Sequence, residues 1–327
     1  MYSVAITGAS GKSGQYFLRR LLKEKEKLKD YRFILLCRKQ EKNSKNVEGY
    51  QIIQSILENK ELQVELFEVD LTDEEKLRKF FEKQHINMLL HIASVKFSEY
   101  IVPAALKGGV DNFILVHTTG IYSKYKAAGE EYRQIEFGIH KLVEEYKNKR
   151  RNIAMTILRP TMIYGDLQDK NVAVFIKMVD KLRIFPTVNG ARYDLQPVWC
   201  KDLGDAYYDV MMKWDITQNK EYILSGKEPI QLREMFEVMA KQLGVKNIFI
   251  SCPYPIAYFG ACVIYMLTLR KIDYREKVQR LVEPRAYSHE KATKDFEYDP
   301  VPFEVGVRNE IKMYKKIYSR KRNSERL

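Results

Sequence analysis

The stretch HTTGIYSKYKAAGEEYRQIE, residues 117–136, contains tyrosines whose spacing to charged residues could support proton transfer. A tyrosine and a lysine four residues apart are neighbours on a helix, and the lysine cation favours the phenolate. Two pairings are open, because Tyr122 is followed by Lys126, whereas Tyr132 has Glu136 at the same offset. A carboxylate opposes phenolate formation, so the elements that carry these residues must decide which tyrosine faces the chemistry.

The composition is that of a soluble globular protein with an excess of positive charge. The chain has 327 residues, of which 45% are hydrophobic and 30% charged, and its formal net charge is +13. This length allows one large domain or two lobes with ample core. The four cysteines have neither Cys-x-x-Cys spacing nor histidines at ligand offsets, which predicts no metal site and a reducing cytoplasm. The amino-terminal residues predict no secretion signal, and no recognisable nucleic-acid-binding module accompanies the basic residues.

Six apolar segments read as strands, and charged segments with helical periodicity separate nearly all of them. Strands that alternate with helices predict an α/β fold of Rossmann type with a doubly wound parallel sheet. The expected strands lie within residues 2–10, 32–38, 62–71, 87–94, 112–119 and 153–160.

The alternation loosens after residue 165, where short strands lead into helices over residues 193–212 and 221–244. We therefore expect a dinucleotide-binding domain of residues 1–165, completed by residues 190–225. A smaller α/β lobe for the substrate would comprise residues 166–189 and 226–327 and would interleave with the first domain.

The segment TGASGKSG places Gly8, Gly11 and Gly14 at three-residue spacing, after a strand and before a helix. The first glycine permits a tight turn and the second lets the backbone approach a pyrophosphate. The third allows the helix to pack closely on the strand, so that the helix amino terminus can receive an anion. This arrangement predicts dinucleotide binding.

Several motifs together resemble the short-chain dehydrogenase/reductase superfamily, in its extended branch of NAD-dependent epimerases and dehydratases. The first is T-G-x-x-G-x-x-G, and VDLTD, HIAS, LRPTMIYG and QPVWCKDLGDA are similar to later motifs of that branch, so the resemblance covers almost the whole chain. It implies that the cofactor contacts Thr7, Gly8, Ser10, Gly11, Lys12, Gly14, Asp70, Leu71, Ala93, Pro160 and Ile163.

The end of the second strand indicates which nicotinamide cofactor binds. An acidic residue there would accept hydrogen bonds from the free ribose 2′-hydroxyl of NAD, but the strand ends in Cys37, Arg38 and Lys39. Arg38 could pair with a 2′-phosphate, together with Lys12 from the glycine loop. We therefore expect NADP rather than NAD.

The resemblance also ranks the two tyrosines. In TTGIYS, Tyr122 matches the tyrosine that ends the family's fifth-strand motif, and Thr118 matches its hydroxyl residue. Tyr132 lies in an expected helix, at a distance from the Arg159–Pro160 turn that suits the family's catalytic tyrosine. Thr118 and Tyr132 would then handle the substrate oxygen, while Glu136, in the place of the family's lysine, could accept hydrogen bonds from the ribose hydroxyls.

The resemblance implies a sugar substrate. Asn171 and Arg192 lie where related epimerases contact a sugar or a diphosphate. The stretch from residue 252 to 300 is similar to the carboxyl lobe of epimerases whose sugar is linked through diphosphate to a polyprenyl lipid. Both a nucleotide-linked and a lipid-diphosphate-linked sugar fit the sequence, and a homodimer is a further expectation.

Residues 253–269, PYPIAYFGACVIYMLTL, contain no charged residue and are followed by Arg270 and Lys271. This run is at the lower limit for crossing a bilayer and begins with two prolines, so a buried or an interfacial helix is expected instead. With the basic tail of residues 310–326, it could hold the protein at the anionic inner face of a membrane.

The leading hypothesis is an NAD(P)-dependent oxidoreductase or epimerase that transfers a hydride between a sugar carbon and nicotinamide. The alternative is a binding module, like the redox-sensing and complex I accessory members of the superfamily, which keep the nucleotide fold and lose the tyrosine–lysine pair. Glu136 is the residue that favours this alternative.

Overall fold

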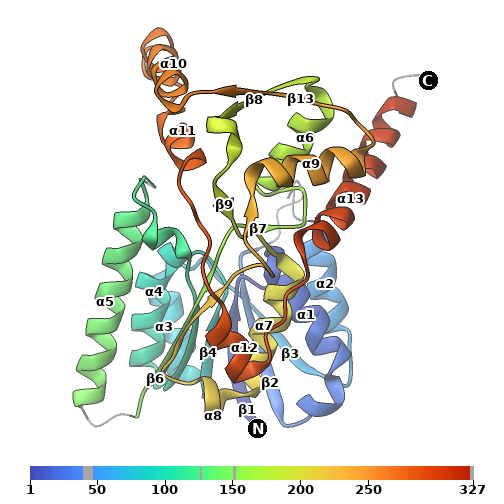
Figure 1. The fold of residues 1–327 in the computed structure, drawn as a ribbon. Helices are drawn as coiled ribbons and strands as arrows, with labels where there is room; N and C mark the ends of the chain where they lie inside the picture. The colour runs from blue at the N-terminus through green and yellow to red at the C-terminus, as the bar shows by residue number, and fades with distance from the viewer. Residues whose placement is uncertain (40–46, 126, 150–151, 325–327) are drawn as a thin grey trace.

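Seven parallel strands form the central sheet, in the order β11-β6-β5-β4-β1-β2-β3 (Figure 1). The computed structural model describes residues 1–39, 47–125, 127–149 and 152–324, with side chains up to residue 317. The strands are β1 (Tyr2–Thr7), β2 (Tyr31–Cys37), β3 (Gln63–Glu68), β4 (Met88–His91), β5 (Asn112–Val116), β6 (Ala154–Pro160) and β11 (Glu221–Leu224). The predicted doubly wound sheet is confirmed, and β11 adds a seventh strand to the six expected.

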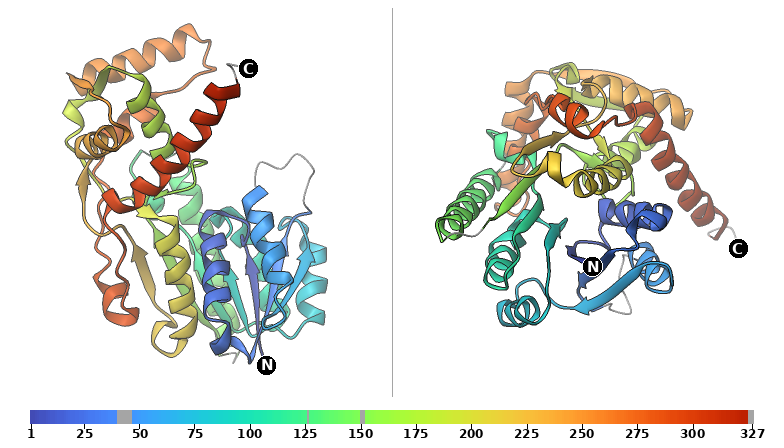
Figure 2. Two further views of the ribbon diagram at one scale, coloured as in Figure 1. Left: turned by 90° about the vertical axis from the view of Figure 1, so that its right-hand side faces the viewer. Right: turned by 90° about the horizontal axis from the view of Figure 1, so that it is seen from below.

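Helices cover both faces of this sheet (Figure 2). One face packs against α1 (Lys12–Lys23), α2 (Val47–Leu57) and α7 (Cys200–Met212). The other packs against α3 (Glu74–Lys83), α4 (Ser98–Lys107) and α5 (Gly129–Asn148). Short 3₁₀ helices join several elements: Lys25–Leu28, Val95–Phe97, Thr119–Tyr122 and Asn189–Ala191.

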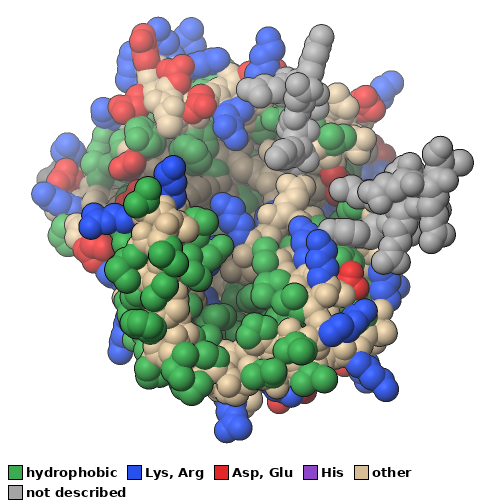
Figure 3. Space-filling model, turned by 90° about the horizontal axis from the view of Figure 1, so that it is seen from above, with side chains coloured by type: hydrophobic (Ala, Val, Ile, Leu, Met, Phe, Trp, Pro, Cys, Tyr) green, Lys and Arg blue, Asp and Glu red, His purple; other side chains and the backbone are tan. Residues whose placement is uncertain are grey.

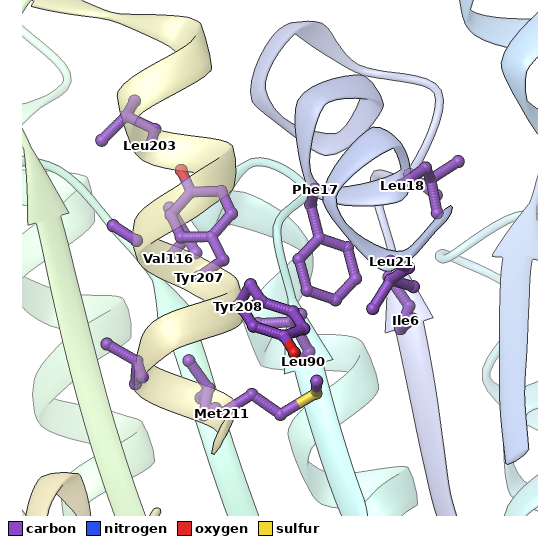
Figure 4. Close-up of a cluster of buried hydrophobic side chains, with 14 of the residues drawn as sticks. Ile6, Phe17, Leu18, Leu21, Leu90, Val116, Leu203, Tyr207, Tyr208 and Met211 are labelled. Atoms are coloured by element: carbon purple, nitrogen blue, oxygen red, sulfur yellow. The ribbon is translucent and has the colours of Figure 1, made fainter. Parts of the chain in front are cut away.

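The contact between α1 and α7 fixes the glycine loop relative to the later half of the chain. Phe17 of α1 and Tyr208 of α7 lie beside one another in the core between these helices (Figure 4). Gly204 of α7 meets α1 so closely that a Cβ there would lie 2.5 Å from the backbone nitrogen of Phe17. A side chain at this position would push the two helices apart.

The strand order reverses between β1 and β4, since β1 pairs with β2 on one side and with β4 on the other. In open α/β sheets, ligands bind beyond the carboxyl ends of the strands at such a reversal. The loops that follow β1, β4, β5 and β6 all begin at this edge of the sheet. Thr7, His91, Val116 and Pro160 close these strands.

A second lobe lies beyond this edge and has its own apolar core. It contains α6 (Val172–Lys181), α9 (Leu232–Leu243), α10 (Tyr254–Leu267), α11 (Arg275–Leu281) and α13 (Phe303–Ser324). Three two-stranded sheets complete it: β7 (Ile163–Tyr164) with β10 (Val198–Trp199), β9 (Asp194–Leu195) with β12 (Ile230–Gln231), and β8 (Ile184–Val188) with β13 (Ile248–Cys252).

The helix α12 (Glu290–Phe296) departs from the domain boundaries expected from the sequence. Ala292, Phe296 and Tyr298 pack into the core of α1 and α7, and the short α8 (Trp214–Thr217) is its neighbour. Residues around 290–298 therefore return from the second lobe to the nucleotide domain. The other predicted boundaries remain a proposal.

The helix α10 stands at the end of the molecule opposite the amino terminus (Figures 1 and 2). Only Ala261 of its 14 residues is buried, so the interpretation of residues 253–269 as a buried helix is wrong. Within the described residues, no helix is both long and apolar enough to cross a membrane. Residues 310–324 of the basic tail form the end of α13, and the side chains beyond residue 317 lie outside the described part.

Candidate functional site

The glycine loop between β1 and α1 has the geometry that an incoming pyrophosphate requires. Gly8 has a φ of +73°, and a Cβ there would lie 2.5 Å from the backbone nitrogen of Ala93. A Cβ on Gly14 would lie 2.2 Å from the carbonyl oxygen of Gly8. Gly11 precedes α1 and has no side chain that could cap it, and no acidic residue occupies the first turn. The first amide groups of α1 can therefore donate to an anion, so these residues fit a dinucleotide.

A small cavity of about 210 Å³ lies next to this loop, at the carboxyl edge of the sheet. Five of the residues predicted to bind the cofactor or to take part in catalysis line this cavity together. They lie at or just beyond the ends of β4, β5 and β6 and on helix α5. These five are Ala93, Thr118, Tyr132, Pro160 and Ile163. Tyr207 of α7 also lines the cavity, and its hydroxyl lies 3.2 Å from Ser13 Oγ.

A larger cavity of about 430 Å³ adjoins the small one and reaches into the second lobe. Thr118, Thr161 and Ile163 line both cavities, so the two spaces meet at Thr118. Thr118 Oγ1 accepts a hydrogen bond from the backbone of Gly120 at 3.0 Å. This contact holds the hydroxyl at the junction, where a substrate in the larger cavity could approach a nicotinamide in the smaller one.

Tyr132 and Tyr122 differ in their relation to these cavities. Tyr132 is half-buried and lines the small cavity, whereas Tyr122 lines neither and is exposed. The ring of Tyr122 instead lies 5.6 Å from that of Tyr287. Lys126, its partner in the literal Y-x-x-x-K spacing, is outside the described residues. Of the two tyrosines, Tyr132 is the one that lines a cavity at the carboxyl edge of the sheet.

Glu136 is buried behind the small cavity rather than facing it. Arg159 Nη2 donates to Glu136 Oε2 at 2.7 Å, and His117 Nδ1 donates to Glu136 Oε1 at 2.9 Å. Arg159 Nη1 also donates to Glu221 at 2.7 Å. Both oxygens of Glu136 accept hydrogen bonds in the interior, so a structural ion pair takes the place of the hydrogen bonds that Glu136 was expected to accept from ribose hydroxyls.

The charges in this network follow from burial and hydrogen bonding. Burial alone would raise the pKa of Glu136, but the hydrogen bonds from His117 and Arg159 lower it to about 2. Burial lowers the pKa of His117, against the opposing effect of Glu136. His117 is thus neutral, and its other nitrogen, Nε2, lies 3.2 Å from Ser98 Oγ. The ion pair is therefore that of Glu136 and Arg159, and His117 orients the carboxylate.

The family's lysine is thus replaced by a neutralised pair. On sequence grounds, Glu136 is expected to oppose the ionisation of a neighbouring phenol. The structure shows that the charge of Glu136 is balanced by Arg159, whose guanidinium is itself shared with Glu221. This balance removes most of the repulsion by Glu136 and also supplies no cation to stabilise a phenolate.

Arg38 and Lys12 do not meet around one cavity. Arg38 is exposed at the end of β2 and lies near Asp70. Hydrogen bonds from Thr72, with a smaller effect of Arg38, lower the pKa of Asp70. Lys12 instead lines the larger cavity and pairs with Asp166 at 3.1 Å. The expectation that Lys12 assists Arg38 at a 2′-phosphate is therefore corrected.

Of the two predicted substrate residues, Asn171 lines the larger cavity and Arg192 does not. Arg192 is exposed, and its side chain lies against Gly190. Two other arginines, Arg280 and Arg285, line the cavity in its place. Neither arginine was expected from the sequence, because more than 150 residues separate them from Thr118.

Arg280 and Arg285 form a pair of neighbouring cations. Burial, followed by the charge of Arg280, lowers the pKa of Arg285 to about 10. The Nε atoms of both arginines are buried and have no hydrogen-bond partner among the described residues. Glu283 between them is engaged by Ser123 Oγ and the backbone of Lys124, each at 2.7 Å. Two adjacent cations with unused donors suit an anionic group such as a diphosphate.

The described residues contain no group of three or more His, Cys, Asp or Glu side chains that could hold a metal ion.

A family model matches residues 4–184, and its description is NAD dependent epimerase/dehydratase family. A search of curated protein sequences finds no match. Solved structures similar to the chain include UDP-glucuronic acid 4-epimerase from Bacillus cereus, in complex with UDP-glucuronic acid and NAD. It is 18% identical, with a TM-score of 0.68, covering 97% of this chain and 100% of that one.

Two further structures have comparable similarity. UDP-glucose 4-epimerase from Thermotoga maritima, with UDP-glucose, is 17% identical with a TM-score of 0.66, covering 97% of this chain and 99% of the other. dTDP-glucose 4,6-dehydratase from Bacillus anthracis, in complex with NAD, is 16% identical with a TM-score of 0.65, covering 97% of each chain. At these identities the likeness establishes the fold.

Proposed function

The chain belongs to the NAD dependent epimerase/dehydratase family, and we propose that it is an NAD(P)-dependent enzyme acting on a diphosphate-linked sugar. The observation that carries the proposal is the junction of the two cavities at Thr118. One cavity adjoins the glycine loop, and the other presents Arg280 and Arg285. The bound dinucleotide would supply a hydride acceptor at this junction.

The protein's own groups divide the remaining tasks. Thr118 and Tyr132 would hydrogen-bond the sugar oxygen, and Tyr132 would exchange a proton with it. Gly8, Gly14 and the amino end of α1 would hold the pyrophosphate of the cofactor, with Ala93, Pro160 and Ile163 beside the nicotinamide. Arg280 and Arg285 would bind the diphosphate of the substrate, and Asn171 would contact the sugar or the diphosphate.

Substrates of two classes fit this proposal. The three solved structures named above are enzymes of nucleotide sugars, two of them with a UDP-sugar bound. Arginines that recognise a diphosphate would serve a nucleotide sugar and a lipid-diphosphate-linked sugar equally. We therefore propose a sugar diphosphate as the substrate class, with the nucleotide or lipid moiety open to experiment.

Calorimetry with UDP, compared with uridine, tests the diphosphate site without requiring turnover. We expect UDP to bind and uridine not to, and Arg285→Gln to weaken UDP binding by roughly tenfold or more, because one charge-assisted contact is lost. Arg192→Gln is the matched control, since Arg192 lies outside the cavity. Equal losses in the two variants, or no binding of UDP by the wild type, would remove the evidence for this site.

NADP is the proposed cofactor in preference to NAD. Arg38 is exposed at the end of β2 and has no acidic residue beside it in the chain to receive a free 2′-hydroxyl. An arginine in this place can bind a 2′-phosphate through two parallel hydrogen bonds. The measurement that tests this preference is the ratio of the affinities for NADPH and NADH.

The buried pair of Glu136 and Arg159 favours a second candidate function. A protein that binds the dinucleotide as a sensor or accessory subunit needs the glycine loop but not a lysine beside Tyr132. Turnover of a panel of sugar diphosphates, followed by NMR, separates the two candidates. If the enzyme is active, Tyr132→Phe should abolish turnover; if the protein is a binding module, no substrate turns over and nucleotide affinity is unaffected by Tyr132→Phe.

Three further expectations from the sequence are proposals. The protein is cytoplasmic, it contacts the inner face of a membrane, and it forms a homodimer. The first is consistent with the reduced cysteines of the described chain. The homodimer rests on the family resemblance and is tested by sedimentation equilibrium.

A further inference from the structure

The apolar side chains of α10 face away from the protein. Ile256, Phe259, Met266 and Leu267 recur at helical spacing and are all exposed, Phe259 by 68% and Leu267 by 79%. A surface helix of a globular protein normally turns such a stripe toward the core. In α10 the side that faces the protein carries Ala261, and the larger apolar side chains lie outside.

The strand that leads into α10 extends this exposed area. In β13, Ile248 and Ile250 alternate with less exposed residues and point outward, and β8 pairs with β13 along its whole length. We call the area formed by Ile248, Ile250, Ile256, Phe259, Met266 and Leu267 the apical surface. Seen from above, apolar side chains gather on this end of the molecule (Figure 3). Exposed apolar areas of this kind mark interaction sites.

The two chain segments that form the apical surface carry charges of one sign. Residues 181–193 and 238–272, which contain β8, β13 and α10, include seven lysines and arginines and no aspartate or glutamate. Arg183 precedes β8, Lys246 precedes β13, and Arg270 and Lys271 follow α10, and all four are exposed. The nearest carboxylate after this segment, Asp273, is paired with Arg275 at 2.7 Å.

We propose that the apical surface docks on an anionic lipid bilayer, with α10 lying in the plane of the interface. The 14 residues of α10 extend about 21 Å, which is short of the ~30 Å hydrocarbon core, so the helix lies on the bilayer rather than across it. Aliphatic side chains enter the acyl region while the flanking cations meet anionic headgroups. This association is independent of the proposed catalysis.

The positive charge of these segments favours a lipid bilayer over a second copy of the chain as the partner of the apical surface. Two apical surfaces placed face to face would bring their lysines and arginines together without a carboxylate from either segment. Such like-charge contacts disfavour the pairing. An anionic bilayer offers both the apolar layer and the opposite charge, and α10 presents no polar side chain on its outer stripe that would require a directional partner.

Co-sedimentation of the full chain with vesicles tests the proposal. The probes are vesicles of phosphatidylcholine alone and of phosphatidylcholine with one third phosphatidylserine, each at low and high salt. We expect binding to the anionic vesicles, weakened by salt. Phe259→Ser and Leu267→Ser should each lower the partition coefficient by roughly tenfold, because each removes a large apolar side chain from the interface. The double change Arg270→Gln and Lys271→Gln should lower it by about tenfold or more.

Phe137→Ser is the matched control, since Phe137 on α5 is 69% exposed, as much as Phe259, but lies outside the apical surface. All of these side chains are exposed, so the variants should keep the wild-type melting temperature. The proposal is overturned if the wild type does not bind anionic vesicles at low salt, or if Phe137→Ser reduces binding as much as Phe259→Ser. It is also overturned if Phe259→Ser dissociates a dimer in sedimentation equilibrium and leaves vesicle binding unchanged, because a second copy would then cover the surface.

Discussion

Replacing Glu136 with glutamine should destabilise the protein although the two side chains have nearly the same shape. The side chains of Glu136 and Arg159 are only 8% and 5% exposed. Glutamine would leave the buried guanidinium of Arg159 with Glu221 as its remaining carboxylate, and Glu221 is partly in solvent. Removing one member of a buried ion pair typically costs ~3–5 kcal/mol, and the remaining contact to Glu221 places this case near ~3 kcal/mol.

The acidity of Glu136 gives a second measure of the same interaction. Its pKa falls from 4.5 to about 2 in the folded protein. At about 1.4 kcal/mol for each pKa unit, this depression corresponds to roughly 3 kcal/mol in favour of the folded state. The unfolded chain binds the proton more tightly, so this stability is complete above pH 4.5 and is lost as the pH falls from 4.5 toward 2.

Urea unfolding at pH 7 measures the effect as a change in the free energy of unfolding. Glu136→Gln and Arg159→Met should each lose about 3 kcal/mol, whereas Glu136→Met combined with Arg159→Met should lose less than the two losses added together, because neither buried charge is left alone. Below pH 4 the difference between wild type and Glu136→Gln should shrink. A loss under about 1 kcal/mol for Glu136→Gln at pH 7 would refute the buried pair.

The same reasoning changes what is expected of Glu136→Lys. On sequence grounds this substitution restores the family's lysine beside Tyr132. In the structure it would place an ammonium against the buried guanidinium of Arg159. Glu136→Lys should therefore be less stable than Glu136→Gln, and a further change of Arg159→Met should recover part of the loss by removing the repulsion.

Three other predictions follow from the site and its surroundings. Tyr132→Phe should abolish turnover of a sugar diphosphate while NADPH affinity is kept, and Tyr122→Phe should have little effect on either, as measured by NMR and calorimetry. Arg38→Asp should narrow or reverse a preference for NADPH over NADH, and equal wild-type affinities for the two would contradict the assignment. Burial, and after it the charge of Asp169, raise the pKa of the Glu310 carboxyl above its usual value of 4.5, so the folded protein holds this proton more tightly than the unfolded chain and its stability should fall as the pH rises above 4.5. Glu310→Gln should remove this slope in urea unfolding, and an unchanged slope would show that Glu310 is ionised.

The nucleotide end of the protein was predictable because it depends on local pattern. A run of apolar residues, three spaced glycines and an amphipathic helix are adjacent in the chain, and each element restricts its neighbour. The glycine positions also exclude any side chain, since a Cβ on Gly14 would lie only 2.2 Å from the carbonyl oxygen of Gly8. The choice of Tyr132 over Tyr122 rested instead on the family resemblance, and the structure places Tyr132 on the long helix α5.

The charge network and the substrate arginines were not predictable in this way. Glu136 meets Arg159 across 23 positions and His117 across 19, and the burial that makes their interaction strong is a property of the packed layers. Arg280 and Arg285 reach the cavity through a segment that returns from the second lobe. Pairs of charges far apart in sequence have many possible partners, and only the fold chooses among them. The sequence could therefore name the residue at the lysine position but not its partner.

In the family, one lysine has two functions, and the pairing of Glu136 with Arg159 indicates that these functions are separate in this protein. A lysine beside the tyrosine both holds the cofactor and supports the phenolate. Here the glycine loop and the amino end of α1 remain available to the cofactor, while the place of the lysine is taken by an ion pair that is neutral overall and faces the interior. Thr118 and Tyr132 keep their places at the cavity that adjoins the loop. Cofactor binding and proton transfer should therefore respond separately to substitution: changes at the glycine loop should reduce nucleotide affinity, and changes at Tyr132 should reduce turnover alone.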